Sequence, residues 1–419
     1  MKFKKIELCN FRAVNKLSIN LSKQLNVFVG VNGAGKSTII DAIAITLSWL
    51  VNRIQRDNAS GRPIPEISIR NAQTGGSITA NINESDTNYC WVIAKNVKGK
   101  NSEHKSRLGD TSKLAAAIRD KAPQTGLPVF AYYPVNRNVL DIPLRIRQKH
   151  TFELFECFDE ALTGAANFRH FFEWFRNRED LENENRKYVD DIFKPENFEF
   201  PDPQLEAVRK ALESFLPEFK RFSVGRNPLR MIAFKNKEEL RIEQLSDGEK
   251  SLIALIGDLA RRLAIANPES KKPLEGKGII LIDEIDLHLH PQWQRMIVPK
   301  LTQVFPGCQF IISTHSPQIL SHVKPENIFL LKNEKQGITY SQPSESYGKN
   351  SDRILEDLMM VDARPSEEKK MLHELFEIIQ KGSLDNARKK VQELKQLIGE
   401  DPELVKADVL IKRREIIGK

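Results

Sequence analysis

The stretch Gly30-Val31-Asn32-Gly33-Ala34-Gly35-Lys36-Ser37-Thr38 decides the fold of this chain. It has the G-x-x-x-x-G-K-S spacing of a phosphate-binding loop. Residues 24–29 before it are typical of a short strand, and residues 37–50 after it are typical of a helix that is apolar on most sides. Glycines let such a loop wrap phosphates, because its amide groups then face an anion at a helix N-terminus. The alternative, a glycine-rich turn that happens to contain Lys-Ser, leaves these flanking elements unexplained.

The side chains of this loop have separate predicted roles. Lys36 is expected to reach the β- and γ-phosphates as a point charge, and the Ser37 hydroxyl is expected to ligate Mg²⁺. The residues predicted to hold the nucleotide, ATP, are Asn32, Gly33, Ala34, Gly35, Lys36, Ser37 and Thr38.

A buried strand that ends in acid is the second feature. Residues 278–282 are apolar, and the carboxylates of Asp283 and Glu284 follow directly. Asp283 is predicted to help hold Mg²⁺, and Glu284 is placed to polarise an attacking water. A buried parallel strand that merely ends in an acidic turn is the alternative, and the phosphate loop argues against it.

A third motif follows another short apolar strand, predicted over residues 308–313. His315 comes just after it, and ligands of open α/β sheets collect at the carboxyl ends of strands. The position predicts a contact of His315 with the γ-phosphate. A purely structural histidine is the alternative.

The segment Leu245-Ser246-Asp247-Gly248-Glu249, called the signature segment below, opens a long apolar helix predicted to reach Ala266. Ser246 and Gly248 stand at the helix start, which is an anion-binding position in its own right.

The composition of the chain limits which partners and which location we expect for it. The net charge of +8 allows a nucleic-acid or acidic partner, and scattered surface lysines explain it equally well. The cysteines are far apart and lack C-x-x-C spacing, which indicates reduced thiols and a cytoplasmic location. The N-terminus does not have the pattern of a signal peptide. The longest apolar run, residues 38–51, contains Asp41 and is too short to span a bilayer, so we expect no membrane partner.

The remaining segments complete the predicted organisation. Residues 63–97 alternate in short runs, residues 67–69 among them, and predict an antiparallel sheet. Residues 98–113 are polar and predict a loop. Residues 151–222 are helical in pattern, and their aromatic stripe favours a buried face over stacking on nucleobases. Residues 353–419 are helical in pattern, either as a docked cap or as an arm for an oligomer or partner.

With all these motifs in this order, residues 1–335 resemble an ATP-binding-cassette (ABC) ATPase of the SMC and RecF type. The resemblance implies an α/β head, with a mixed sheet around the phosphate loop, an antiparallel sheet, a short helical insertion and a C-terminal helical extension. The domains expected are 1–150 and 226–335 for the two halves of the head, 151–225 for the helical insertion and 336–419 for an oligomer or partner contact.

The resemblance also implies how the motifs act. Ser246, Gly248 and Glu249 of the signature segment would bind the ATP held by an opposing subunit, which gives a head-to-tail homodimer with ATP between the chains. Arg12 would contact the nucleotide, Asp286 would belong to the loop after the acidic strand, and His315 would be the switch histidine. No convincing glutamine-loop residue follows the early sheet, and residues 136–137 are a weak substitute.

At finer grain, residues 132–147, 245–259 and 402–408 resemble PtuA, the ATPase of the Septu anti-phage system and of related retron modules. That resemblance implies an ATPase without a nuclease centre of its own, which regulates or scaffolds an HNH nuclease similar to PtuB. A RecF-like repair ATPase that acts on DNA without a nuclease is the alternative. An enzyme with its own Toprim nuclease would need clustered carboxylates that the C-terminal region lacks, and a transporter ATPase fits the motifs less well.

Overall fold

The computed structural model describes residues 1–100, 104–135, 152–163, 168–190, 198–334, 337–362 and 364–417. The chain forms two compact units, Met1–Lys349 and Asn350–Lys419. The residues that carry the predicted chemistry belong to the first unit. The division of that unit into functional domains remains a prediction.

Within the described residues, the core of the first unit is a six-stranded mixed sheet. Its central strands β3, β11, β10 and β6 are parallel, β12 extends the sheet in parallel beside β3, and β13 is antiparallel at the edge. The sheet order is β13 (Gly337–Ser341), β12 (Ile328–Glu334), β3 (Leu25–Val29), β11 (Cys308–Thr314), β10 (Gly278–Ile282) and β6 (Val129–Tyr133). Strands β3, β10 and β11 are buried throughout, as expected for a parallel sheet covered on both faces.

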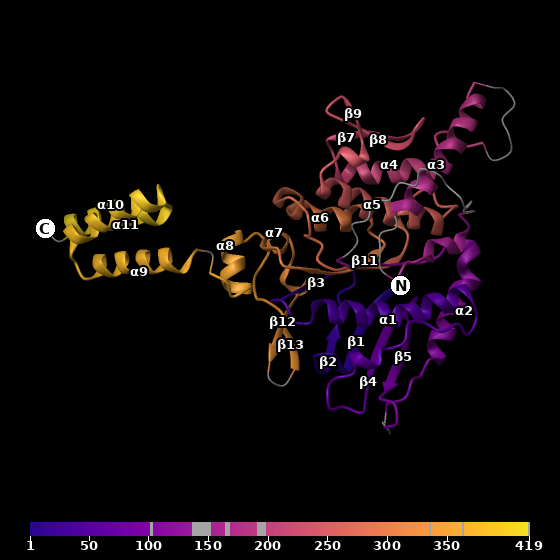
Figure 1. The fold of residues 1–419 in the computed structure, drawn as a ribbon, viewed down its shortest axis with the longest axis horizontal. Helices are drawn as coiled ribbons and strands as arrows, with labels where there is room; N and C mark the ends of the chain where they lie inside the picture. Colours follow the sequence, from indigo (N-terminus) through magenta and orange to yellow (C-terminus); the bar gives the residue numbers. More distant parts are fainter. Residues whose placement is uncertain are drawn as a thin grey trace. The chain divides into compact units, whose positions relative to one another are not determined.

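Helix α1 (Lys36–Gln55) lies between this sheet and a second one (Figure 1). The second sheet is antiparallel, in the order β2 (Val14–Asn20), β1 (Lys2–Phe11), β4 (Gly75–Glu84) and β5 (Thr87–Asn96). Helix α1 is longer than the apolar run of the sequence, and by length and composition it could cross a membrane. Most of it is buried between the two sheets, which identifies it as the core helix of the fold. The predicted α/β class is therefore confirmed.

Two local predictions were wrong. Residues 67–69 do not form a strand, because Pro65 leads into a 3-10 helix (η1, Glu66–Ser68) and leaves Ile67 94% exposed. The predicted loop 98–113 ends in a helix, α2 (Gly109–Thr125), which buries Leu114 and Ile118 against α1 and β5. Apolar residues at helical spacing thus outweighed the polar character of the segment.

The region predicted to be helical over residues 151–222 contains the 3-10 helices η2 (Leu154–Phe158) and η3 (Arg186–Tyr188) and the helices α3 (Phe168–Asn185) and α4 (Pro203–Phe215). Its last residues instead begin a strand of a three-stranded sheet, β7 (Phe219–Arg226), β8 (Leu229–Lys235) and β9 (Glu238–Arg241). We call α3, α4 and these strands the helical lobe. Its aromatic stripe is buried, as predicted, so these rings are unavailable to nucleobases: Phe168, Phe171, Phe172 and Phe175.

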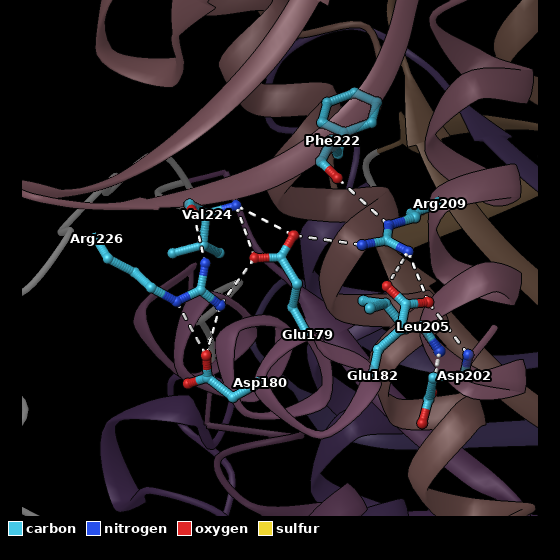
Figure 2. A network of polar contacts seen from close by, with 9 residues as sticks. All are labelled: Glu179, Asp180, Glu182, Asp202, Leu205, Arg209, Phe222, Val224 and Arg226. Carbon is cyan, nitrogen blue, oxygen red and sulfur yellow. Dashed lines mark hydrogen bonds and ion pairs between the residues drawn. The ribbon is translucent and has the colours of Figure 1, made fainter. Parts of the chain in front are cut away.

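A polar network cross-links the helical lobe (Figure 2). Glu179 of α3 lies 3.3 Å from Arg209 of α4 and 3.2 Å from Arg226 of β7. Arg209 also pairs with Glu182 at 2.8 Å. The carboxylates of Glu179 and Glu182 are buried, and buried charges are tolerated when they are paired and hydrogen-bonded. The network therefore holds two helices and a strand as one body.

Further elements complete both units. In the first unit they are η4 (Ile242–Gln244), α5 (Asp247–Ala266), η5 (Pro273–Glu275), α6 (Pro291–Val304), α7 (Pro317–Leu320) and η6 (Pro325–Asn327). The second unit has α8 (Ser351–Arg353), a π-helical turn (Ile354–Leu358), α9 (Ser366–Gln380), α10 (Leu384–Ile398) and α11 (Pro402–Ile417). Helices α9, α10 and α11 share an apolar core that includes Leu375, Val391 and Leu404.

Candidate functional site

The phosphate loop lies between β3 and α1, in the order predicted. Gly35 caps α1 with a φ of 100°, a left-handed conformation that favours glycine. A side chain at Gly35 would collide with Ile338, and one at Gly30 would approach the Leu331 carbonyl oxygen to 2.7 Å. Gly35 is therefore required by the turn and by its packing against β13, and Gly30 by its packing against β12.

Lys36 is buried within this loop. Its Nζ donates to the carbonyl oxygens of Gly30 at 2.9 Å and Val31 at 3.3 Å. Burial lowers the pKa of Lys36, while Glu284, Asp283 and Asp286 oppose that shift. These carboxylates are therefore close enough to Lys36 to act on its charge.

The carboxylates follow β10, and the end of the neighbouring strand β11 fixes them. The Ser313 hydroxyl donates to Asp283, which is 2% exposed, and accepts the backbone amide of Glu284 at 2.8 Å. Glu284 has a φ of 46°, an uncommon conformation for a residue other than glycine. Backbone strain of this kind is concentrated at functional sites.

His315 and Asp286 form the next part of the site. One carboxylate oxygen of Asp286 accepts the Thr314 hydroxyl at 2.6 Å and the backbone amide of His315 at 3.3 Å. The Nε2 atom of His315 is buried without a hydrogen-bond partner among the described residues. Burial and the charge of Lys36 lower the pKa of His315, although the nearby carboxylates raise it. The ring is therefore neutral at pH 7, with an unsatisfied nitrogen at the site.

The signature segment begins α5 with a capping box. The Ser246 hydroxyl donates to Glu249 at 2.7 Å, and the Glu249 amide donates back to Ser246 at 3.4 Å. Glu249 is also 2.6 Å from Lys235 of β8. Burial raises the pKa of Glu249, but the hydrogen bonds from Lys235 and Ser246 outweigh burial and the net shift is downward. The carboxylate of Glu249 is thus directed at Ser246 and Lys235.

Arg12 lies at the side of the phosphate loop. It donates to Asp41 of α1 at 2.6 Å, and Arg62 donates to the other oxygen of the same carboxylate at 2.8 Å. Asp41 follows Ser37 by four residues, so both side chains lie on one face of the helix. Burial, Asp283 and Asp41 raise the pKa of Tyr132, while Arg62 and Arg12 oppose them. The two arginines therefore flank the same site.

The structure thus brings the phosphate loop, Asp283, Glu284 and His315 together at the carboxyl ends of three neighbouring strands. The signature segment lies at the start of α5, which contacts α3, α4 and β6, and its Gly248 packs closely against the His288 carbonyl oxygen in the loop after β10. The sequence reasoning missed Ser313 and Arg62. Ser313 lies within β11, two residues before His315, so its place beside that motif was a signal; Arg62 had none. The weak candidates Asn136 and Arg137 lie outside the described residues.

The family model described as "AAA domain, putative AbiEii toxin, Type IV TA system" matches residues 25–321. The chain is 34% identical to the Retron Ec83 probable ATPase of Escherichia coli, with 98% of this chain and 86% of that protein covered. It is 32% identical to the Retron Vc95 probable ATPase of Vibrio cholerae serotype O1 biovar El Tor, with 93% and 85% covered. The Septu protein PtuA of Bacillus thuringiensis is 26% identical, with 86% and 84% covered.

Among solved structures, an Smc head domain bound to the C-terminal domain of ScpA derived from Pyrococcus furiosus matches with a TM-score of 0.48 and 18% identity, and covers 81% of this chain and 96% of that one. The family model spans most of the first unit, and the retron ATPases align along nearly the whole chain. The chain belongs to this AAA family and is an ATPase.

Proposed function

We propose that this ATPase binds ATP on the phosphate loop and hydrolyses it after a second copy closes over the nucleotide, and that it acts in anti-phage defence. The observation that carries the proposal is the cluster formed by Lys36, Glu284 and His315. One buried cation, one strained carboxylate and one unsatisfied buried nitrogen face the same site. A polyanion that accepts hydrogen bonds fits Lys36 and the His315 nitrogen, and a water beside that polyanion fits the carboxylate of Glu284.

The reaction follows from the position of these groups. Glu284 acts as the base that orients a water and accepts its proton while the water oxygen attacks the γ-phosphorus. The bond from that phosphorus to the β–γ bridging oxygen breaks, and ADP and inorganic phosphate leave. Lys36 and the loop amides stabilise the charge on the phosphates, and His315, in the tautomer with the proton on Nε2, donates to a γ-phosphate oxygen. Arg12 supplies a further positive charge beside the loop.

Mg²⁺ fits the remaining donors. The Ser37 hydroxyl and the buried Asp283 carboxylate supply hard oxygen ligands, and such a site typically uses few protein ligands beside phosphate and water. When bound, the ion would neutralise charge on the β- and γ-phosphates. Asp283 is suited to that role because Ser313 holds its orientation.

The second copy supplies its signature segment. Ser246 begins a helix of 20 residues, and helix N-termini bind anions through free amides and the helix dipole. Gly248 and Glu249 complete this helix start. The nucleotide would then lie between the phosphate loop of one chain and the signature segment of the other, in a head-to-tail homodimer or a larger assembly.

The names of the relatives support the biological setting. Retron ATPases and Septu PtuA are the proteins to which the chain is similar. We propose that this chain, like PtuA and the related retron ATPases that its sequence resembles, controls an HNH nuclease similar to PtuB. The proposed location is the cytoplasm, and DNA is a further proposed ligand. The alternative is a RecF-like repair ATPase without a nuclease partner.

Sedimentation tests whether ATP joins two copies of the chain. The Glu284→Gln protein should form a dimer with ATP and a monomer without it, and Ser246→Arg in that background should abolish the dimer. If the sedimentation of Glu284→Gln did not depend on ATP, the head-to-tail dimer with ATP between the chains would be overturned.

A second experiment tests the nuclease partner. The tagged protein should co-purify with an HNH protein encoded beside its gene, and a gene neighbourhood without a nuclease would favour the repair function.

A further inference from the structure

Asp258 is a fully buried carboxylate in the middle of α5, away from the predicted nucleotide-binding residues. It accepts the Tyr133 hydroxyl at 2.9 Å, Arg261 Nη2 at 2.8 Å and Arg262 Nε at 2.7 Å. Both arginines are 1% exposed. A buried charge is costly unless it is paired, so a site with two cations and one anion requires an explanation.

The protonation states make these bonds directional. Burial acts to raise the pKa of Asp258, but Arg262 and Arg261 outweigh burial and the net shift is downward, so the group stays ionised. Burial and Asp258 raise the pKa of Tyr133, so the phenol remains a donor. Arg262 also donates to the carbonyl oxygens of Cys157 at 2.8 Å and Asp159 at 3.0 Å. Asp258 thereby links three separate segments of the chain.

One of these segments, β6, ends beside the carboxylates of Asp283 and Glu284. Tyr133 is the last residue of β6, and its carbonyl oxygen accepts the backbone amide of Asp283 at 2.8 Å. Successive residues of a strand point to opposite faces. Tyr132 accordingly faces the charges of Asp283 and Asp41, while Tyr133 faces α5. The end of β6 therefore connects the candidate nucleotide site, which Tyr132 faces, with α5, which Tyr133 faces.

The other end of that connection is the signature segment. Asp258 follows Ser246 by twelve residues, about 18 Å along a continuous helix at 1.5 Å per residue. The same part of α5 carries the helical lobe, because a side chain at Gly257 would approach the Phe171 ring of α3 to 2.8 Å. The lobe is itself cross-linked by the network of Figure 2. Asp258 thus joins a rigid lobe and its signature segment to the strand beside the catalytic carboxylates.

We infer that Tyr133 and Asp258 are positioning residues for the signature segment. The hydrogen bond from Tyr133 to Asp258 sets where α5, and with it Ser246, stands relative to the sheet. The inference rests on the proposed head-to-tail function, because Ser246 then acts on the nucleotide of the other chain. Loss of the Tyr133 hydroxyl should therefore impair hydrolysis at the partner's phosphate loop and spare nucleotide binding to its own.

The first test is Tyr133→Phe, which removes only the hydroxyl and leaves Asp258 paired with both arginines. The kcat should fall about tenfold, with the Kd for a fluorescent ATP analogue within about twofold of wild type. Thermal unfolding should show a single folded state, and Tyr347→Phe, at a tyrosine that is 66% exposed, should match wild type in all measurements. An unchanged kcat, or a weakened Kd that accounts for the whole loss, would overturn the inference.

The second test mixes variants and asks which chain the hydroxyl serves. Tyr133→Phe mixed with Glu284→Gln should regain activity, because one interface then joins an intact phosphate loop to an intact signature segment. Tyr133→Phe mixed with Ser246→Ala should not regain activity, because both signature segments are impaired. The opposite pattern would show that Tyr133 acts on its own chain's nucleotide. That result would overturn this inference and leave the head-to-tail arrangement standing.

The mixture of Ser246→Ala with Glu284→Gln tests the proposed head-to-tail arrangement separately from the inference about Tyr133. Recovery of activity in that mixture supports the head-to-tail arrangement independently of Tyr133. Failure to recover there overturns the arrangement and the inference with it.

Discussion

The Ser246 hydroxyl and the Glu249 carboxylate are joined at 2.7 Å, and Lys235 holds the other oxygen of that carboxylate at 2.6 Å. Glu249 was predicted among the nucleotide-binding residues. Its contacts within the chain add a second role, which is to orient Ser246 at the start of α5. A strand of the helical lobe and the helix start are thereby joined through one side chain.

Glu249→Ala should remove both the capping box and the pair with Lys235. The free energy of unfolding should fall by about 1 kcal/mol, as for other lost N-terminal caps, and kcat should fall with it. Glu249→Gln keeps an acceptor for Ser246 and should retain most of the turnover. Urea unfolding and steady-state ATP hydrolysis measure the two effects, with the exposed Glu243→Ala as control. Equal loss of ATP affinity in both variants would indicate direct nucleotide contact instead.

Glu284→Gln should leave ATP binding intact and reduce kcat by about 100-fold or more, because the amide cannot accept the proton of the attacking water. The positive φ of Glu284 and the bond of its amide to Ser313 are backbone features that glutamine preserves. Isothermal titration with ATP and single-turnover hydrolysis separate binding from chemistry. The exposed Glu326→Gln serves as a matched control. Turnover at the wild-type rate would exclude Glu284 as the base.

His315 should make stability depend on pH. Burial and then Lys36 lower its pKa in the folded state, so the unfolded chain binds this proton more readily. The stabilisation is therefore present above the unfolded pKa, near 6.5, and is lost as the pH falls through the lower folded value. His315→Gln should flatten the dependence of the urea midpoint on pH below about 6.5, while the exposed His322→Gln should leave it unchanged. Equal slopes for His315→Gln and wild type would contradict the assignment.

The parts of the site that could be predicted are those fixed by short spacing. The phosphate loop, the acidic end of β10 and His315 after β11 each follow a buried strand, so the parallel sheet brings them to one edge. Contacts between distant segments could not be predicted. The pairing of Arg62 with Asp41, and of Lys235 with Glu249, depends on how the sheets and the lobe pack.

The errors in the fold have a similar cause. Three alternating residues at 67–69 carry too little information to specify a strand, and Pro65 favours a turn there. The apolar residues at the start of β7, Phe219 and Phe222, are spaced as on a helix, so the sequence pattern predicts a helix up to residue 222. Its pairing with β8 overrides that local pattern.

Gly248 provides a test of packing at the signature segment. A Cβ atom there would lie 2.5 Å from the His288 carbonyl oxygen and 3.1 Å from the Trp293 ring, so the helix start or the loop after β10 must shift. Gly248→Ala should therefore lower the free energy of unfolding by about 1–3 kcal/mol, although alanine is the better helix former. Gly109 begins α2 with no atom within 4 Å of its Cβ position, so Gly109→Ala should be neutral or stabilising. Both effects are measured by urea unfolding, and turnover should fall for Gly248→Ala alone. If Gly248→Ala is as stable and as active as Gly109→Ala, the close packing of the signature segment on the loop after β10 does not constrain the site.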